Sequence, residues 1–450
     1  MPPRDRHKHA KAAKVNSRLS AAQPSAQALE EAQTLQQRAE RKRGREAVTA
    51  YEHAANKFQR ALDLEQRAPL SFERHCDAYF GLAEVLQNWA EGVLAVCRTL
   101  PDAELTREAE QAASSIAKSL FKKAVESYQQ VRTGTREIRA DAAVNSGNTL
   151  AAWAELLAPP EAIQMLATAQ QAYEAALAQE SDAATWGNRA DAFVRQAELV
   201  AEGAGEQAGR ESSQQAYEQG MEAYATACSL TSTEQGDDLP GLLHNWGVGL
   251  RSMAEHTADD EAACRAYSLA VQKLQASIQF ARGDVAPYNA LGDAYAGWAE
   301  RLPDGSVEQQ LKLGNALQEG YQAALHVNAN TSEALVGIAE VKGRMGRLLQ
   351  RNGSSDARRH FTEGAQAYQK ALQAPSNLGS MQDRNETRYN FACLLCLSTQ
   401  QEAAMNVLAE LVKKDGVASQ DLITDEDFTD MRELPAFQHL IQQAQHSNTT

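Results

Sequence analysis

The sequence predicts an all-α fold, a solenoid of stacked antiparallel helix pairs, and two observations lead to this expectation. Ala, Gln, Glu and Leu, which favour helices, dominate the 450-residue chain, and only 12 prolines and 27 glycines interrupt it. A short pattern also recurs along most of the chain at a nearly constant interval, which is the mark of a repeat architecture. Because one compact core rarely serves a chain of this length, an elongated stack is favoured over a single globular domain.

The recurring pattern is an aromatic or large apolar residue followed, three positions later, by a small one. The leading residues are Phe58, Tyr128, Tyr173, Tyr224, Leu274, Tyr321 and Tyr368, and from Tyr128 onward they are 45 to 51 residues apart. A second bulky residue stands seven positions before six of them: Tyr51, Phe121, Leu166, Tyr217, Tyr267 and Phe361. Seven residues make two helical turns, so both groups lie on one face. We expect this face to pack the second helix of each pair onto its neighbours.

The first helix of each pair has signatures of its own. The triplet WAE occurs at 89–91, 153–155 and 298–300, and a proline follows each time, three to ten residues later. Proline cannot donate the next backbone hydrogen bond, so it marks the end of the first helix. The expected unit is therefore helix, turn, helix and short linker.

Four segments follow from these patterns. Residues 1–25 form a basic, disordered head, and residues 26–66 form an amphipathic N-terminal helical cap. About seven helix pairs fill residues 71–414. Residues 415–450 combine an acidic linker with a C-terminal capping helix. Caps of this kind give a solenoid polar ends.

Charge is spread unevenly over the chain, whose formal net charge is −15. Residues 1–20 carry six cations against one acid: Arg4, Arg6, Lys8, Lys11, Lys14 and Arg18 against Asp5. The acidic remainder disfavours nucleic acid, because affinity for phosphate backbones rests on Lys and Arg. The head is expected to be a solvated end. The alternatives are a weak nucleic-acid contact through residues 1–20, a nuclear import signal, or a chloroplast or mitochondrial transit peptide.

The six cysteines are typical of a reduced, cytosolic chain, because no secretory segment precedes them. Apolar runs are too short to span a bilayer, so no membrane partner is expected. The predicted location is the cytoplasm, with the nucleus or an organelle as alternatives.

One segment resembles a known family. In YNALGDAYAGWAERL, residues 288–302, Tyr288, Leu291, Gly292 and Tyr295 match the first helix of a tetratricopeptide repeat, and YQAALHVNAN from Tyr321 resembles the second helix. YNFACLL and the tail DEDFTDMRELPAFQHLI resemble the closing part of such arrays. The resemblance implies a right-handed superhelical solenoid of extended units that binds other proteins in its concave groove. The usual unit has 34 residues, so these units are longer.

One pair of residues has the spacing of a redox or metal-binding motif. Cys393 and Cys396 form a CxxC motif, but they lie in the apolar helical run FACLLCL and no second ligand pair accompanies them. We expect buried thiols rather than a redox or zinc site. Hydrolase, Walker and dinucleotide motifs are absent from the sequence. The chain is therefore predicted to be no enzyme and to need no cofactor or metal.

Asparagines on the first helices are the candidate binding residues. Most stand two positions before a small residue, and stacking would align them along the groove: Asn145, Asn148, Asn188, Asn245, Asn289 and Asn390. A side-chain amide can pair with the backbone of an extended peptide whatever its sequence. The competing interpretation is that these residues cap helices or bridge turns.

Asn148 and the run Asn188-Arg189 also resemble two parts of the clamp with which chaperone-binding repeats hold a carboxylate. The third part is missing, because LLHNWGVGL at 242–250 has no Lys. The leading function is an interaction scaffold that holds partner segments in its groove. The first alternative is an RNA- or ribosome-associated, translation-linked factor that uses the basic head. The second is a co-chaperone or organellar assembly factor.

Overall fold

The computed structural model describes residues 24–65, 70–101, 104–131, 134–203, 207–231, 238–374, 378–414 and 416–447. Every regular element in these ranges is helical. The basic head and its nucleic-acid contact lie outside the described residues, apart from the two last residues of the head, because α1 begins at Pro24.

The helices follow one another as antiparallel pairs. The first pair is α1 (Pro24–Ala39) with α2 (Gly44–Glu65). The next pairs are α3 (Phe72–Arg98) with α4 (Arg107–Gln130), α5 (Arg136–Ala154) with α6 (Pro159–Leu177), and α7 (Ala183–Gly203) with α8 (Gln207–Leu230). They continue as α9 (Leu239–His256) with α10 (Asp260–Phe280), and α11 (Ala286–Glu300) with a second helix in three parts: α12 (Val307–Asn315), η2 (Ala316–Tyr321) and α13 (Gln322–Val327). The last pairs are α14 (Ser332–Arg351) with α15 (Ala357–Gln373), and α16 (Met381–Leu397) with α17 (Gln401–Lys413).

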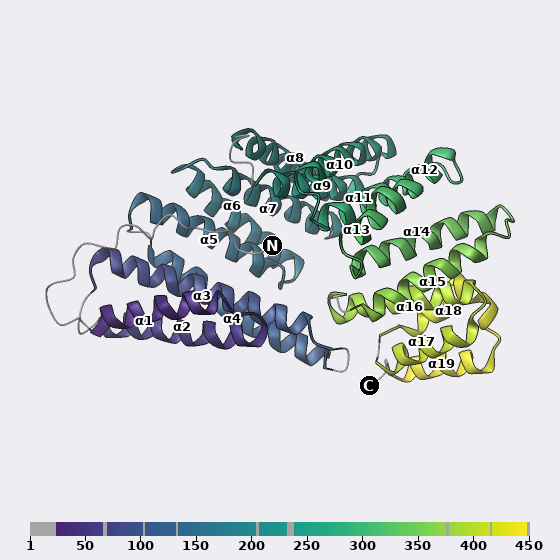
Figure 1. Ribbon diagram of the computed structural model, residues 1–450, viewed down its shortest axis with the longest axis horizontal. Helices are drawn as coiled ribbons and strands as arrows, with labels where there is room; N and C mark the ends of the chain where they lie inside the picture. Colours follow the sequence, from purple (N-terminus) through teal and green to yellow (C-terminus); the bar gives the residue numbers. More distant parts are fainter. Residues whose placement is uncertain are drawn as a thin grey trace.

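The pairs stack side by side into a curved solenoid (Figure 1). Each first helix contacts the second helix of its own pair, and α7, α9, α11 and α14 also contact one another in succession. Figure 1 shows α8, α10 and α12 on the outer rim of the curve, with α7, α9 and α11 on its inside. The predicted fold, an all-α tetratricopeptide-like solenoid of about seven extended units, is confirmed.

The predicted bulky stripe on the second helices forms the core. All but one of its members are buried, and the exception, Tyr51, is half-buried. The rings of Tyr173, Tyr224 and Tyr368 are each at most 2% exposed, so each fills the space between helices of adjoining layers. A fully buried aromatic side chain contributes on the order of 2–3 kcal/mol through the area it removes from water.

Polar side chains fix where the helices begin. Ser71, Thr106, Thr135, Ser306 and Ser380 each accept a hydrogen bond from the backbone N–H three residues later. Such caps satisfy donors that a helix leaves unpaired, and each contributes about 1 kcal/mol. The capping residue in the sequence of each unit therefore determines where the helix begins.

One second helix departs from regular α geometry. In η2 the hydrogen bonds widen to a π-helix, and Gly320 there crosses the first helix at Gly292. A Cβ on Gly320 would lie 2.4 Å from the Gly292 Cα, closer than any side chain tolerates. The two backbones therefore touch, and only glycine at this crossing permits it.

The curve brings the first repeat unit back against the last. Arg384 of α16 donates from its two terminal nitrogens to the backbone oxygens of Leu100 (3.1 Å) and Arg98 (2.9 Å) at the end of α3. The Met381 backbone N–H donates to Glu110 Oε1 of α4 at 2.8 Å. The solenoid is therefore an arch whose ends meet.

Three further elements close the C-terminal end: α18 (Ser419–Thr424), the 3₁₀ helix η3 (Glu426–Met431) and α19 (Pro435–Ser447). The first two occupy the stretch predicted as an acidic linker. Phe428, Met431 and Phe437 are fully buried beneath α16 and α17, so this stretch packs as a cap. Within the described residues, none of the helices combines the length and apolar character that crossing a bilayer demands.

Candidate functional site

The first helices share a register, set by small residues against which second-helix side chains pack. A Cβ on Gly147 would lie 2.5 Å from the Tyr173 ring, and one on Gly292 would lie 2.6 Å from the Tyr321 ring. A Cβ on Gly247 would likewise lie 2.6 Å from the Leu274 side chain. These contacts align the first helices residue by residue.

The next residue along each first helix from α5 onward occupies one shared register position. We call these residues the joint row: Asn148, Asp191, Val248, Asp293, Glu340 and Cys393. Seven positions after four of these residues, and after Glu84 of α3, is a second row, which we call the glutamate row: Glu91, Glu155, Glu198, Glu255 and Glu300. Seven residues make two turns, so the two rows share one face of the first helices.

Asn148 joins three helices. Its Oδ1 accepts a hydrogen bond from the Tyr173 hydroxyl of α6 at 2.9 Å and from Asn188 Nδ2 of α7 at 3.0 Å. The amide of Asn148 therefore bonds to its own second helix and to the next first helix at once.

Asp191 forms the same joint one unit later, with a charge in place of the amide. It accepts from the Tyr224 hydroxyl of α8, and Asn245 Nδ2 of α9 lies 3.1 Å from Oδ2 and 3.3 Å from Oδ1. Burial raises the pKa of Asp191 to about 6, although both donors act in the opposite direction. This carboxylate is ionised at neutral pH, but only because the two donors offset part of its desolvation.

At the remaining joints, the polarity of the joint-row residue matches the second-helix residue that it faces. Where the second helix offers Leu274, with no hydroxyl, the joint row holds Val248. Where it offers Tyr321, the joint row holds Asp293, which accepts from the Tyr321 hydroxyl at 2.8 Å. A polar residue stands at a joint of this kind when a hydroxyl is present to satisfy it.

Most of the predicted asparagines form side-chain hydrogen bonds within the protein. Asn148, Asn188 and Asn245 bond across joints, and Asn390 hydrogen-bonds to the Tyr368 hydroxyl. Asn145 is half-buried, and its backbone oxygen accepts from Thr149. Asn289 is one residue out of register with the others. Its Oδ1 is buried and has no partner among the described residues.

The glutamate row is the part of the inner face that stays in contact with water. Glu91, Glu155, Glu255 and Glu300 are exposed and Glu198 is half-exposed. Each follows a buried alanine that fixes the helix against its pair, as Ala254 does for Glu255 and Ala299 for Glu300. These side chains are available to a partner.

Surrounding protein and neighbouring charges both disfavour ionisation on this face. Glu91, Glu255 and Glu340 are exposed, yet desolvation by the surrounding protein raises the pKa of each. Neighbouring carboxylates add to the effect, with Glu155 acting on Glu91 and Asp293 acting on both Glu255 and Glu340. A positively charged group brought to this face would relieve both effects.

Arginines neutralise part of this charge. Arg195 pairs with Glu198 at 2.9 Å, Arg251 pairs with Glu255 at 3.0 Å, and Arg344 pairs with Glu300. No such ion pair involves Glu91 or Glu155 in the described residues. The inner face therefore keeps a net negative charge.

Sequence reasoning missed the glutamate row and the acidic members of the joint row. The signal was present, because WAE occurs three times, and Gln196-Ala197-Glu198 and Met253-Ala254-Glu255 continue the pattern with another residue in place of Trp. Its glutamate, rather than its tryptophan, is the surface feature. Asp191 and Asp293 could have been found from their position beside the small residue that faces a tyrosine.

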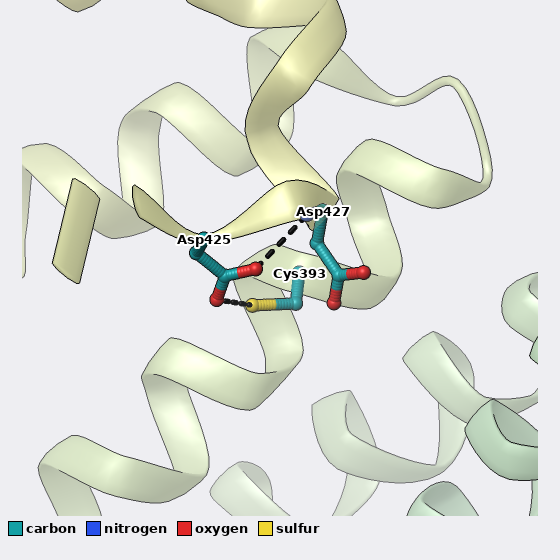
Figure 2. Close-up of side chains that lie close together, drawn as sticks. All are labelled: Cys393, Asp425 and Asp427. Carbon is teal, nitrogen blue, oxygen red and sulfur yellow. Dashed lines mark hydrogen bonds between the residues drawn. The ribbon is translucent and has the colours of Figure 1, made fainter. Parts of the chain in front are cut away.

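The CxxC cysteines are buried, as predicted: Cys393 is 4% and Cys396 is 6% exposed. Figure 2 shows Cys393 beside Asp425 and Asp427 of the cap, with Cys393 Sγ 3.7 Å from Asp425 Oδ2. In the part of the chain that the structure describes, these three residues form the one group whose potential ligand atoms lie close enough together to bind a single metal ion.

The trio is already satisfied by protein groups. Asp427 pairs with Arg347, and Asp425 accepts from the Tyr389 hydroxyl at 2.7 Å. Burial raises the pKa of the Cys393 thiol, so the thiol keeps its proton at neutral pH. The cluster therefore ties the C-terminal cap to α16 and does not have the charge or the open ligands that a metal ion requires.

No protein-family model matches the chain, and neither does any curated protein. Several solved helical-repeat structures are similar. The S. pombe nuclear import adaptor Nro1 is 13% identical, with 67% of this chain and 94% of that chain covered and a TM-score of 0.42. Aspartyl phosphate phosphatase F from Bacillus subtilis is 11% identical, with 97% and 96% covered and a TM-score of 0.41. Human IFIT1, solved with PPP-AAAA, is 11% identical, with 89% and 88% covered and a TM-score of 0.31. Function must therefore be argued from this chain's own residues.

Proposed function

We propose that this chain is a non-enzymatic interaction scaffold that binds an extended segment of a partner protein along its inner helices. The observation that carries the proposal is the glutamate row. Five first helices each present a carboxylate at one register position, on the inside of the curve, where water reaches them. Because helices of successive units contact one another, these groups form a continuous track rather than five separate sites.

The asparagines have a narrower role in this proposal than the sequence alone implied. Asn148, Asn188 and Asn245 hold the track in shape, since their amides are bonded across joints. Asn289 makes no side-chain hydrogen bond in the described residues. Its Oδ1 is buried, so we assign its Nδ2 as the donor to the partner's backbone.

Two alternatives receive less support. The co-chaperone alternative requires free amides at Asn148 and Asn188, but these bond to each other. The RNA-associated alternative requires a cationic surface, whereas the inner face is acidic and the basic head lies outside the described residues. A cytoplasmic, nuclear or organellar location stays a prediction.

Site-specific photo-cross-linking tests the proposal. A benzophenone amino acid replaces Asn289 on the inner face or, as the control, Glu174 on α6, which is exposed on a second helix. In cells that express the chain, we expect discrete protein adducts from position 289 that map to one segment of the captured protein, and none of these from position 174. The same adducts from both positions, or none from position 289, would contradict the proposal.

A further inference from the structure

The acidic inner face has a candidate occupant within this same chain. In the described residues, six water-accessible carboxylates line it: the five members of the glutamate row together with Glu340. Three arginines pair with them, so the face offers more negative than positive groups to whatever occupies it. The basic head, residues 1–20, carries six cations and one acid, which makes it the most cationic stretch of an otherwise acidic chain.

We propose that the basic head binds along the glutamate row of its own solenoid and competes there with the partner segment. The inference rests on the proposed function, because it assigns a partner chemistry, a Lys- and Arg-rich segment, to the same inner face.

The spacing of the cations suits the spacing of the helices. Lys8, Lys11 and Lys14 follow one another at intervals of three residues. In the polyproline II form of an extended chain, three residues make one turn and advance about 9 Å, so lysines three apart lie on one side. Packed helices lie about 8–10 Å apart. An extended segment crossing the first helices would thus bring one lysine to each successive carboxylate.

The head is also long enough to reach the track. The described chain begins at Pro24 of α1, and α1 packs against α2 and α3 at the start of the solenoid. The 23 residues before Pro24 can extend over about 75 Å, whereas a first helix of 20 residues is about 30 Å long. Because the head is attached to the solenoid, its effective concentration at the track is on the order of millimolar.

The test uses a labelled peptide of residues 1–23 and the chain lacking those residues, with binding followed by fluorescence anisotropy. We expect saturable binding that weakens at least tenfold between 50 and 500 mM NaCl, because salt screens exposed charges. The full-length chain should bind the peptide at least tenfold more weakly than the shortened chain, since its own head competes. A peptide with the six cations replaced by Gln should not bind.

Matched variants locate the site. The inner triple variant Glu155→Gln, Glu255→Gln and Glu300→Gln should weaken binding at least tenfold. The outer triple variant Glu126→Gln, Glu174→Gln and Glu222→Gln removes the same charge from exposed positions on α4, α6 and α8 and should leave binding unchanged. Circular dichroism confirms that both variants fold.

The outcomes separate this inference from the proposed function. If the peptide does not bind, binds equally to the full-length chain, or responds equally to both triple variants, self-occupancy is overturned. Adducts from position 289 would in that case still support the scaffold. If the peptide binds at the glutamate row but position 289 yields no partner adduct even in the chain lacking residues 1–23, the scaffold proposal fails and the head contact remains.

Discussion

The joint between α5, α7 and α9 and the joint between α11 and α14 solve one problem in opposite ways. The first uses hydrogen bonds, as Asn245 of one first helix bonds to Asp191 of the one before it. The second depends on close approach: Gly320 of η2 touches Gly292 of α11 within one pair, and Gly337 of α14 stands where the other joints place an asparagine, against the Tyr321 ring. The one hydrogen bond described above at this joint runs from the Tyr321 hydroxyl to Asp293.

This difference decides which residues tolerate change. A hydrogen-bonded joint has polar groups that become costly when their partners are lost, because the remaining group stays buried. A glycine-packed joint has no spare volume, so any added atom must displace backbone. Sensitivity to polar deletion should therefore be greatest at α5–α9, and sensitivity to added methyl groups should be greatest at α11–α14.

The largest effect is expected from Gly320→Ala. The new Cβ would lie 2.4 Å from the Gly292 Cα, so the two backbones must separate, and unfolding free energy should fall by about 3 kcal/mol. Gly314→Ala, in the same second helix, meets nothing within 4 Å and should raise stability by up to about 1 kcal/mol through helix propensity. Urea unfolding followed by circular dichroism measures both. Equal effects would show that the π-helical crossing is not close-packed.

A pH-dependent effect, which reaches a similar size only at the high end of the pH range, is expected from exchanging the two hydrogen-bonded joints. The pKa of Asp191 is about 6 in the folded chain against an ordinary 3.8, so the folded chain binds its proton more tightly than the unfolded chain does. The stability from this group is present below pH 3.8 and is lost as the pH rises through 6, by about 3 kcal/mol in all. Asp191→Asn, which reproduces the residue at Asn148, should therefore gain stability relative to the parent chain between pH 4 and pH 7.

The reciprocal change provides the control for that pH dependence. Asn148→Asp should lose stability relative to the parent chain over the same pH range, because it places a carboxyl group at the equivalent joint. Unfolding midpoints at pH 4.5 and pH 7.5 report the two slopes. Slopes of the same sign in both variants would mean that other carboxylates dominate the pH dependence.

The smallest effect separates two of the predicted asparagines. Asn245→Ala removes a donor from a buried carboxylate and should cost about 1–2 kcal/mol, most of it above pH 6, where Asp191 is charged. Asn289→Ala removes no bond seen in the described residues and should change stability by less than about 0.5 kcal/mol. Thermal unfolding of the two variants compares them. A larger loss for Asn289→Ala would place its amide in a joint rather than at the partner surface.

The sequence by itself determined the helix pairs, their number and their core. Helix-forming composition, capping residues such as Ser71 and Ser380, and the seven-residue spacing of Phe121 and Tyr128 are local signals, and each acts within one helix or across one turn. They predict the structure of a unit because a unit in a repeat protein contacts mainly its neighbours. The burial of Cys393 and Cys396 followed from the same local pattern.

Only the tertiary structure decided which polar residues are engaged and which are available. Asn245 and Asn289 look alike in the sequence, but a shift of one position, about 100° around the helix, gives the first a bond to Asp191 and leaves the second without one. The closure between Arg384 and the end of α3 joins residues almost 300 positions apart, and no local pattern encodes it. Whether a polar side chain is free to bind a partner depends on the contacts between units. These contacts depend in turn on the small rotation that relates each helix pair to the next. That rotation is set by side-chain packing in three dimensions rather than by any spacing that can be read along the chain.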